Sequence, residues 1–502
     1  MSKRNYNILC LITIIIITFV GCSDILNPST VTNVVINPRN VHVYAGNTQQ
    51  FTATVRGENN PSQRVSWSIV GNNSEQTTIN SNGLLSVASN ETSMEIRVTA
   101  TSREDTSKSS NTSVTISIMG NTYSVIDVES WNEAITGIRN AGHNRIHTIN
   151  VFSFVSVSGS SANLFGSNSN IQVTIEGVEG QGNLSLSSNG SLIRVGQQQT
   201  VITRNITLQG RTQDYDRNGV VYVNGGIFIM EDGTNVRYNV GAPGVYINSG
   251  LFDMQGGLIT ENSYGTGFGD GGRGVFMASG QFIMSGNSEI SNNRSYRTGG
   301  GGVAIEGGSF IMNDGLIMDN YSYQTGGAVF IIEGNFTMNG GMIMSNFGRI
   351  GGGGISVGSG GRFTMNDGNI HANYAISGSG GGILASRGFW ERDISIMMSG
   401  GSISYNFAHE SGGGVSVYGD NMHTSIRFTM NGGSITENTV NQNGGGVNLV
   451  SNATLNKTGG TISGNTASVR GNTAFRTDTS QWRNADAGQN DNTATIGFWL
   501  ND

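Results

Sequence analysis

The chain has 502 residues, with 27 basic and 34 acidic side chains and a formal net charge of −7. No basic stripe is visible, which argues against nucleic acid as a partner, because phosphate backbones are bound by clustered lysine and arginine. Charged residues make up only 12% of the chain and glycine accounts for 76 residues, a composition that is also found in disordered chains. The apolar residues are strictly periodic, however, and this predicts a folded repeat structure.

The first residues are typical of an export signal. Lys3 and Arg4 precede an apolar run at residues 8–20, which is too short for a membrane-spanning helix of about 20 residues. The run ends in Gly21 and Cys22 and resembles a lipobox, although Phe19 stands where leucine is usual. We therefore expect residues 1–21 to be a lipoprotein signal peptide, Cys22 to be lipidated, and residues 22–30 to form a linker.

Cysteine usage agrees with this expectation. Cys10 and Cys22 are the only cysteines, and Cys10 would leave with the signal peptide. A single thiol in an oxidising compartment would be reactive, and acylation would remove that reactivity. We expect an exported monomer anchored by its lipid to the outer membrane or the cell surface, with no cofactor.

Residues 31–118 predict a small β-sandwich. Apolar residues alternate with polar ones over several short segments, which turn residues such as Gly46 and Asn82-Gly83 separate. The alternating sets are Val41, Val43 and Ala45; Phe51, Ala53 and Val55; Val65, Trp67 and Ile69; Leu85 and Val87; Ile96, Val98 and Ala100; and Val114, Ile116 and Ile118. Such a segment can bury one modest core.

This segment resembles a group 2 bacterial Ig-like domain. The residues that carry the resemblance are Val34-Val35-Ile36-Asn37-Pro38, Gln50-Phe51-Thr52-Ala53, Val65-Ser66-Trp67, Asn82-Gly83-Leu84-Leu85-Ser86-Val87 and Val98-Thr99-Ala100. The resemblance implies a spacer or an adhesive module on a surface protein, and it implies no catalytic residue.

Residues 119–480 predict a β-helix, because from Gly226 onward three short strand patterns recur with a mean step of about 28 residues. The first pattern is Gly-Val or Gly-Ile, the second is Gly-x-Phe-x-Met, and the third is Gly-x-Ile-x-x-Asn. The phenylalanine column comprises Phe228, Phe252, Phe282, Phe310, Phe336, Phe363, Ile396, Phe428 and Leu455. The methionine column comprises Met230, Met254, Met284, Met312, Met338, Met365, Met398, Met430 and Lys457.

No 3.6-residue period appears, so these segments are strands, and residues at i and i+2 share a face. If each repeat forms one coil of three strands, equivalent side chains stack at a spacing of about 4.8 Å. The third pattern ends in an asparagine column, for which we expect a left-handed turn conformation and hydrogen bonds from coil to coil. Its members are Asn239, Asn262, Asn293, Asn320, Asn346, Asn373, Asn406, Asn438 and Asn465.

The start of the array needs a cap for its exposed strand edge. Residues 130–138 predict a helix with Ser130 and Glu133 as a capping box. Residues 481–502 are expected to be a C-terminal cap or tail.

The array resembles the pectin-lyase-like right-handed parallel β-helix. Its Gly-Gly-Ala-Val segment at residues 326–329 and its aliphatic-x-x-Asn repeats also look like those of chlamydial polymorphic outer-membrane proteins and spirochaetal surface repeat proteins. The expected fold class is therefore all-β: an Ig-like sandwich followed by a long, right-handed, three-sheet parallel β-helix with an N-terminal capping helix.

Catalytic chemistry finds little support in the sequence. Asp314 and Asp367 occupy the same turn position two coils apart, which favours turn chemistry over a catalytic pair. His371, His409 and His423 lie in unrelated positions, and no metal-ligand spacing appears. We therefore expect a non-enzymatic adhesin-like repeat protein that binds glycans or proteins. The alternative is a β-helix polysaccharide lyase or glycoside hydrolase that acts on uronic-acid polymers.

Two long inserts in adjacent coils form the candidate binding site. Exposed aromatic rings beside polar groups could stack on a sugar or a peptide, whereas the plainer interpretation is two surface loops whose aromatics cover their own bases. The candidate residues are Phe389, Trp390, Glu391, Asp393, Tyr418, Asp420 and His423.

Overall fold

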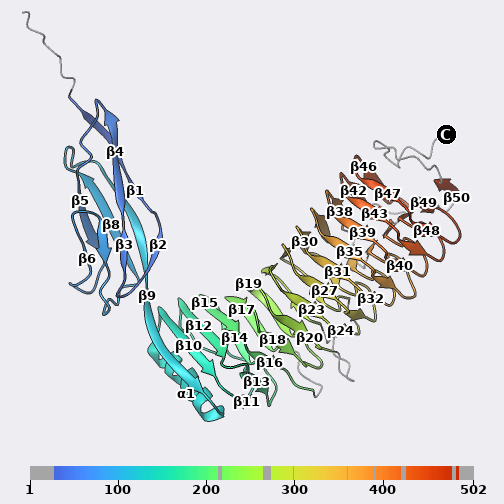
Figure 1. Ribbon diagram of the computed structural model, residues 1–502, viewed down its shortest axis with the longest axis horizontal. Helices are drawn as coiled ribbons and strands as arrows, with labels where there is room; N and C mark the ends of the chain where they lie inside the picture. Colours follow the sequence, from blue (N-terminus) through green and yellow to red (C-terminus); the bar gives the residue numbers. More distant parts are fainter. Residues whose placement is uncertain are drawn as a thin grey trace, which may run out of the picture. The chain divides into compact units, whose positions relative to one another are not determined.

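The computed structural model describes residues 28–212, 218–263, 273–297, 299–358, 360–387, 392–419, 426–477 and 482–485. Cys22 and the predicted signal peptide lie outside these residues. The chain divides into two compact units between Ile116 and Ser117. The described residues are nearly all-β with one short helix, which confirms the predicted fold class (Figure 1).

The first unit is a small sandwich of antiparallel strands. Strand β1 pairs with β4, β8 pairs with both β5 and β9, and β7 pairs with both β3 and β6. The strands are β1 (Thr30–Asn37), β2 (Val41–Tyr44), β3 (Thr48–Gln50), β4 (Thr52–Glu58), β5 (Val65–Val70), β6 (Thr78–Ile79), β7 (Leu84–Ser86), β8 (Glu95–Ser102) and β9 (Ser109–Val125).

The core of the first unit contains the residues that the alternation predicts. Phe51 and Leu85 are fully buried, and the partly buried Trp67 packs against Phe51 with ring centroids 6.4 Å apart. Gly83 lies beneath the indole with φ of +80°, and a Cβ there would lie 2.5 Å from the carbonyl oxygen of Phe51. Only glycine fits this turn without displacing the backbone.

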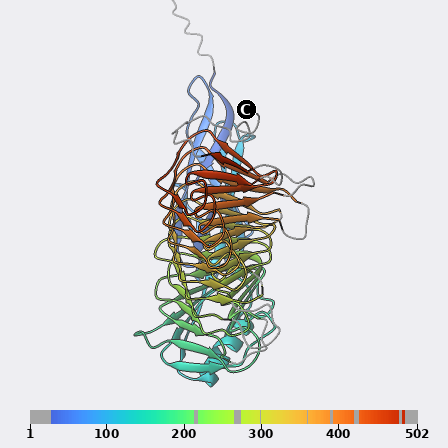
Figure 2. The same cartoon turned by 90° about the vertical axis from the view of Figure 1, so that its right-hand side faces the viewer.

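The second unit is a parallel β-helix in which each coil hydrogen-bonds to the coils before and after it. Figures 1 and 2 show the coils stacked one on the next. Strand β9 leads into it, because its last residues, from Ile118 to Val125, pair in parallel with β10. Four ladders run along the solenoid, and we name them by their recurring residues.

The valine ladder carries the first predicted pattern. Its strands are β14 (Ile193–Gly196), the first halves of β17 (Val221–Met230) and β19 (Val245–Met254), β21 (Val275–Met277), β25 (Val303–Ile305), β29 (Val329–Ile331), β33 (Ile355–Val357), β37 (Ile383–Ser386), β41 (Val415–Tyr418), β45 (Val447–Val450) and β49 (Ala474–Thr477). Strand β50 (Trp482–Ala485) pairs with β49 in the antiparallel sense.

The phenylalanine ladder carries the second pattern. Its strands are β10 (Arg145–Val151), β12 (Ile171–Gly177), β15 (Gln199–Arg204), the second halves of β17 and β19, β22 (Gln281–Met284), β26 (Ser309–Met312), β30 (Asn335–Met338), β34 (Arg362–Met365), β38 (Ile394–Met398), β42 (Ile426–Met430) and β46 (Thr454–Lys457).

The isoleucine ladder carries the third pattern and is a 12-stranded sheet within the described residues, so the solenoid has about 12 turns. Its strands are β11 (Phe154–Val157), β13 (Asn183–Leu186), β16 (Thr207–Gln209), β18 (Asn235–Arg237), β20 (Leu258–Thr260), β23 (Glu289–Ser291), β27 (Leu316–Met318), β31 (Met342–Met344), β35 (Asn369–His371), β39 (Ser402–Ser404), β43 (Ser434–Thr436) and β47 (Thr461–Ser463).

A fourth, short ladder was not predicted. It follows the asparagine column in the C-terminal coils, and the second residue of each two-residue strand is buried, except Ala467 in the last strand, which is half-buried. The strands are β24 (Arg294–Ser295), β28 (Tyr321–Ser322), β32 (Phe347–Gly348), β36 (Tyr374–Ala375), β40 (Phe407–Ala408), β44 (Thr439–Val440) and β48 (Thr466–Ala467). Strands of two residues are too short to show an alternating pattern, which is why three strands per coil were predicted.

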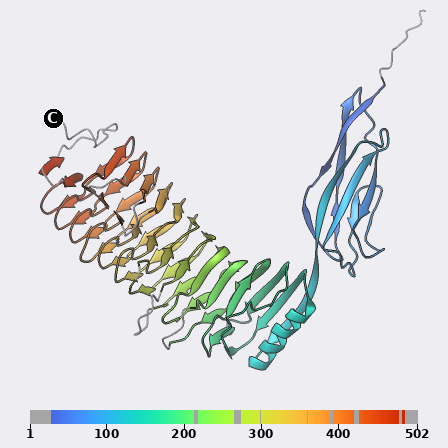
Figure 3. The ribbon, with the colours of Figure 1, turned by 180° about the vertical axis from the view of Figure 1, so that it is seen from behind.

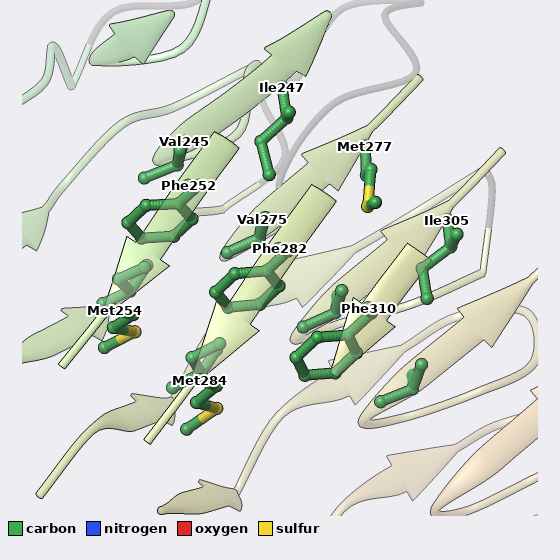
Figure 4. Packing of buried hydrophobic residues seen from close by; sticks show 14 of the residues in the cluster. Val245, Ile247, Phe252, Met254, Val275, Met277, Phe282, Met284, Ile305 and Phe310 are labelled. Carbon is green, nitrogen blue, oxygen red and sulfur yellow. The ribbon is translucent and has the colours of Figure 1, made fainter. Parts of the chain in front are cut away.

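The core of the solenoid is a set of stacked columns, as predicted (Figure 4). The rings of Phe282 and Phe310 lie 4.4 Å apart and nearly parallel, and those of Phe310 and Phe336 lie 4.5 Å apart. Methionines such as Met284 form the neighbouring column and are also fully buried. Lys457 ends that column with an exposed fraction of 8%.

The asparagine column forms a continuous buried hydrogen-bond ladder. Oδ1 of Asn346 accepts hydrogen bonds from the backbone N–H and the Nδ2 of Asn320, each at 3.0 Å. Nδ2 of Asn346 donates to the carbonyl oxygens of Ile317 and Met344 and to Oδ1 of Asn373. The same bonds join each successive pair from Asn262 to Asn465. Each side chain therefore satisfies backbone groups at a corner of the coil.

The expected left-handed conformation of these asparagines is wrong. Before Asn465, Gly464 has a φ of 67°, and the residue before each of the other eight asparagines has a positive φ between 49° and 57°. These residues are Tyr238, Glu261, Asn292, Asp319, Ser345, Ala372, Tyr405 and Glu437. The preceding residue makes the turn, so the asparagine side chain can point inward and reach its neighbours.

Helix α1 (Val128–Ala141) lies at the start of the solenoid (Figure 3). Trp131, Ala134, Ile135 and Ile138 are buried in the solenoid core. The capping box differs from the predicted one: the N-cap is Asp127, and Ser130 occupies the position that was assigned to Glu133. The helix begins two residues earlier than predicted, so the capping pair is shifted toward the N-terminus.

The asparagine ladder predicts a large difference between two identical substitutions in one coil. Asn346→Ala should lower the free energy of unfolding by about 3–5 kcal/mol, because several buried backbone groups lose their partners. Asn339→Ala removes exposed amide contacts to Asn313 and Asn366 and should cost less than about 1 kcal/mol. Denaturant unfolding of both variants measures the difference, and equal losses would contradict the ladder's role.

His147 predicts a pH dependence of stability in the first coils. Its ring is fully buried, Nδ1 accepts the Asn121 N–H at 3.1 Å, and Nε2 has no hydrogen-bond partner among the described residues. Burial lowers the pKa of His147, and the charge of Arg145 lowers it further. The unfolded chain therefore binds a proton that the folded chain excludes, and stability should fall as the pH drops below about 6.5 toward the folded pKa.

His147→Asn retains an acceptor near the position of Nδ1 and cannot be protonated. The variant should lose part of the decrease in melting temperature that the native protein shows between pH 7.5 and pH 5. His409→Asn, at an exposed position, is the matched control and should retain the native decrease. Identical pH profiles for all three proteins would rule out this role of His147.

Candidate ligand-binding surface

The two predicted binding inserts lie between strands of adjacent coils. Strand β37 pairs with β41 in parallel, with Ser386 opposite Tyr418. The structure describes Asp393 and Tyr418, and both lie next to their inserts, at the ends of β38 and β41. The other predicted binding residues lie outside the described residues. These are Phe389, Trp390, Glu391, Asp420 and His423.

The described parts of the inserts contact the solenoid itself. The hydroxyl oxygen of Tyr418 lies 2.7 Å from Oγ of Ser379, which belongs to the preceding coil. Arg392 pairs with Glu333 at 2.8 Å and lies over Gly360, whose added Cβ would be 3.2 Å from Cδ of Arg392. Because both ends of this ion pair are well exposed, it contributes at most about 1 kcal/mol. Asp393 is exposed beside it.

A second candidate is a shallow hollow of about 390 Å³ at the turns between the phenylalanine and isoleucine ladders. Asp314 and Asp367 flank it, and Gly340 in the intervening coil leaves the space open. Oδ1 of each aspartate accepts the N–H of the following glycine at 2.8 Å. The carboxylates therefore have the turn role that the sequence predicts, and both residues line the hollow.

Neither a metal site nor a membrane span is found among the described residues. They contain no group of three or more His, Cys, Asp or Glu side chains placed to hold a metal ion. In the same residues, no helix is long and apolar enough to cross a membrane.

The third candidate surface, on the short ladder, was missed by sequence reasoning. Its outward side chains are aromatic in four successive coils, at Tyr321, Phe347, Tyr374 and Phe407. Each of them directly follows a column asparagine and precedes a small buried residue. The Asn-aromatic-small pattern is visible in the sequence, but a two-residue strand is too short to show the alternation that predicts strands.

Comparison with known proteins identifies one part of the chain. Residues 30–112 match the family model described as bacterial Ig-like domain (group 2). No curated protein matches the chain. The group 2 Ig-like domain confirms the resemblance of the first unit. It is followed by the β-solenoid, which is the predicted arrangement.

The match ends at residue 112, before the division of the chain at Ile116. All three candidate surfaces lie on the solenoid. The family match therefore identifies the first unit alone, and the solenoid's role depends on its own residues.

Proposed function

We propose that this protein is a lipoprotein that faces the cell surface or the periplasm and serves as a non-enzymatic, adhesin-like repeat protein. Its solenoid binds glycans or proteins of a host or of the cell envelope. The Ig-like domain serves as a spacer between the lipid on Cys22 and the solenoid.

The main support is that the residues which recur along the core have structural uses. Phenylalanines and methionines fill the core columns, and the asparagines satisfy backbone groups from coil to coil. A catalytic site would require polar groups that stacking does not explain. The outward faces vary from coil to coil, so the fold provides a long surface that can diversify while the core is retained.

The membrane anchor is supported by the sequence of the first residues. Lys3, Arg4 and the apolar run fit an export signal, and Cys22 is the one cysteine that would remain after cleavage. Several acyl chains, each contributing about 0.8 kcal/mol per buried CH₂, would hold the protein firmly on a membrane.

Export and anchoring can be tested together in whole cells. Cells that express the protein would be labelled with radioactive palmitate and then treated with external protease. We expect the native protein to carry label and to be digested, and we expect Cys22→Ser to lose the label and the membrane association. Cys10→Ser is the matched control and should behave like the native protein. An unlabelled native protein that stays in the cytoplasm would overturn the proposal.

The hollow between Asp314 and Asp367 favours one second candidate, the cleavage of uronic-acid polymers. Inverting glycosidases hold two carboxylates about 6.5–9.5 Å apart, which is near the spacing of two coils. The mature protein would be assayed on uronic-acid polymers with and without calcium. An enzyme that uses this pair should lose at least about 100-fold in rate on Asp314→Asn, whereas Asp253→Asn at another exterior position should be unaffected. Inactivity of the native protein on all polymers would remove this candidate.

A further inference from the structure

The outward side of the short ladder is an exposed aromatic surface with its own charge. We call it the short-ladder face, and it comprises residues 294–297, 321–324, 347–350, 374–377 and 407–410, apart from the buried second residue of each segment. The buried residues are Ser295, Ser322, Gly348, Ala375 and Ala408. Because alternate residues of a strand point to opposite sides, the first and third residues of each segment point outward.

Aromatic rings contact one another along this face. Tyr323 makes edge contacts with Tyr296 and Tyr321, with ring centroids 5.1 Å and 4.8 Å apart. Further along, Phe347 stacks on Tyr374 with centroids 5.3 Å apart. The contacts fix the rings in rows that follow the solenoid axis, so a ligand would meet a preformed surface at little cost in side-chain entropy.

The face also exposes more apolar surface than folding requires. The exposed fractions are 46% for Tyr296, 51% for Ile350, 38% for Tyr374 and 40% for Ile376. Single exposed apolar residues are common, but a contiguous group of them on one face marks an interaction site. Here they lie in three of four successive coils, and the coil between Tyr296 and Ile350 presents the half-buried rings of Tyr321 and Tyr323.

The charge of this face differs from that of the chain as a whole. The chain has a net charge of −7, yet Arg294, Arg297 and Arg349 lie exposed within three successive coils of the face. Burial raises the pKa of Tyr321, and the charges of Arg349 and Arg294 act against this rise, so both guanidinium groups are within electrostatic reach of its hydroxyl. The acidic residue on the face is Glu410, at its far end.

Three features together describe the ligand. The arginines require an anionic group, and carboxylates and sulfates can accept two parallel hydrogen bonds from a guanidinium. The aromatic rows suit the apolar faces of sugar rings. The groups recur at the spacing of the coils, about 4.8 Å, so the surface suits an extended chain of repeating units better than a compact molecule.

We propose that the short-ladder face binds a linear anionic polysaccharide, whose carboxylate or sulfate groups contact Arg294 and Arg349 while its sugar rings lie against the aromatic rows. This inference deepens the proposed function, because it rests on the solenoid being a binding surface and names both the face and the ligand class. It rests on other residues than the inserts around Tyr418 and the hollow at Asp314 do.

The charge requirement is tested by titrating the mature protein with heparin, hyaluronan and dextran. Heparin carries sulfates, hyaluronan carries only carboxylates, and dextran is neutral. We expect binding of at least one anionic polymer, weakened by added salt, and none of dextran. The double variant Arg294→Gln/Arg349→Gln should weaken that binding about tenfold. The matched control Arg362→Gln/Arg427→Gln removes the same charge from exposed positions of the phenylalanine ladder and should bind like the native protein.

A second pair of variants tests the aromatic rows. Tyr374→Ser should weaken binding of the same polymer, whereas Tyr44→Ser, at a similarly exposed position of the Ig-like domain, should leave it unchanged. Melting temperatures close to native would show that each variant is folded.

Several results would overturn the inference. One is an equal loss of polysaccharide affinity in the two arginine double variants, which would indicate diffuse electrostatic attraction without a specific site. The inference would also be overturned if single-stranded DNA bound more tightly than heparin and hyaluronan, or if neither of these polysaccharides bound. A protein that is lipidated and surface-exposed but binds neither polymer refutes this inference alone. A protein that is neither exported nor anchored refutes the proposed function.

Discussion

Each coil of the solenoid satisfies its backbone hydrogen bonds on the coils before and after it, and this constraint governs the rest of the structure. Parallel pairing in register places equivalent residues above one another, as with Phe282, Phe310 and Phe336. A residue type that packs well against itself is therefore favoured in every coil. The asparagine ladder extends the same rule to the corner, where a side chain bonds backbone groups that the strands leave unpaired.

The constraint applies to the inward side chains and leaves the outward ones free. Extra residues are accommodated at turns, as in the coil that contains Arg392 and the coil that follows it. Outward rows can become aromatic and basic, as on the short-ladder face, or acidic, as at Asp314 and Asp367, without disturbing the core. Function in this protein therefore depends on its outer faces, while the repeated sequence pattern reports almost entirely on the core.

The residues that repeat along the core could be predicted from the sequence, whereas features that depend on backbone geometry could not. The phenylalanine, methionine and asparagine columns were predicted because stacking demands the same residue in each coil. We predicted the left-handed turn at the asparagines, whereas residues such as Asp319 adopt it. The residue type at this position changes from coil to coil, so no sequence pattern marks the turn. Strands such as β28 were missed because two residues cannot show a period. Of the predicted binding residues, the structure describes Asp393 and Tyr418, so the roles of Trp390 and its neighbours stay predictions.

Hydrogen–deuterium exchange of the intact protein, read by mass spectrometry, tests most directly whether coil-to-coil pairing holds the solenoid together. The amides of β26 and β30, which pair with strands on both sides, should be protected for far longer than those of Gly340 and Gly341 in the turn that follows β30. If the phenylalanine-bearing strands exchanged as fast as these turns, the stacked and hydrogen-bonded core would not exist in solution.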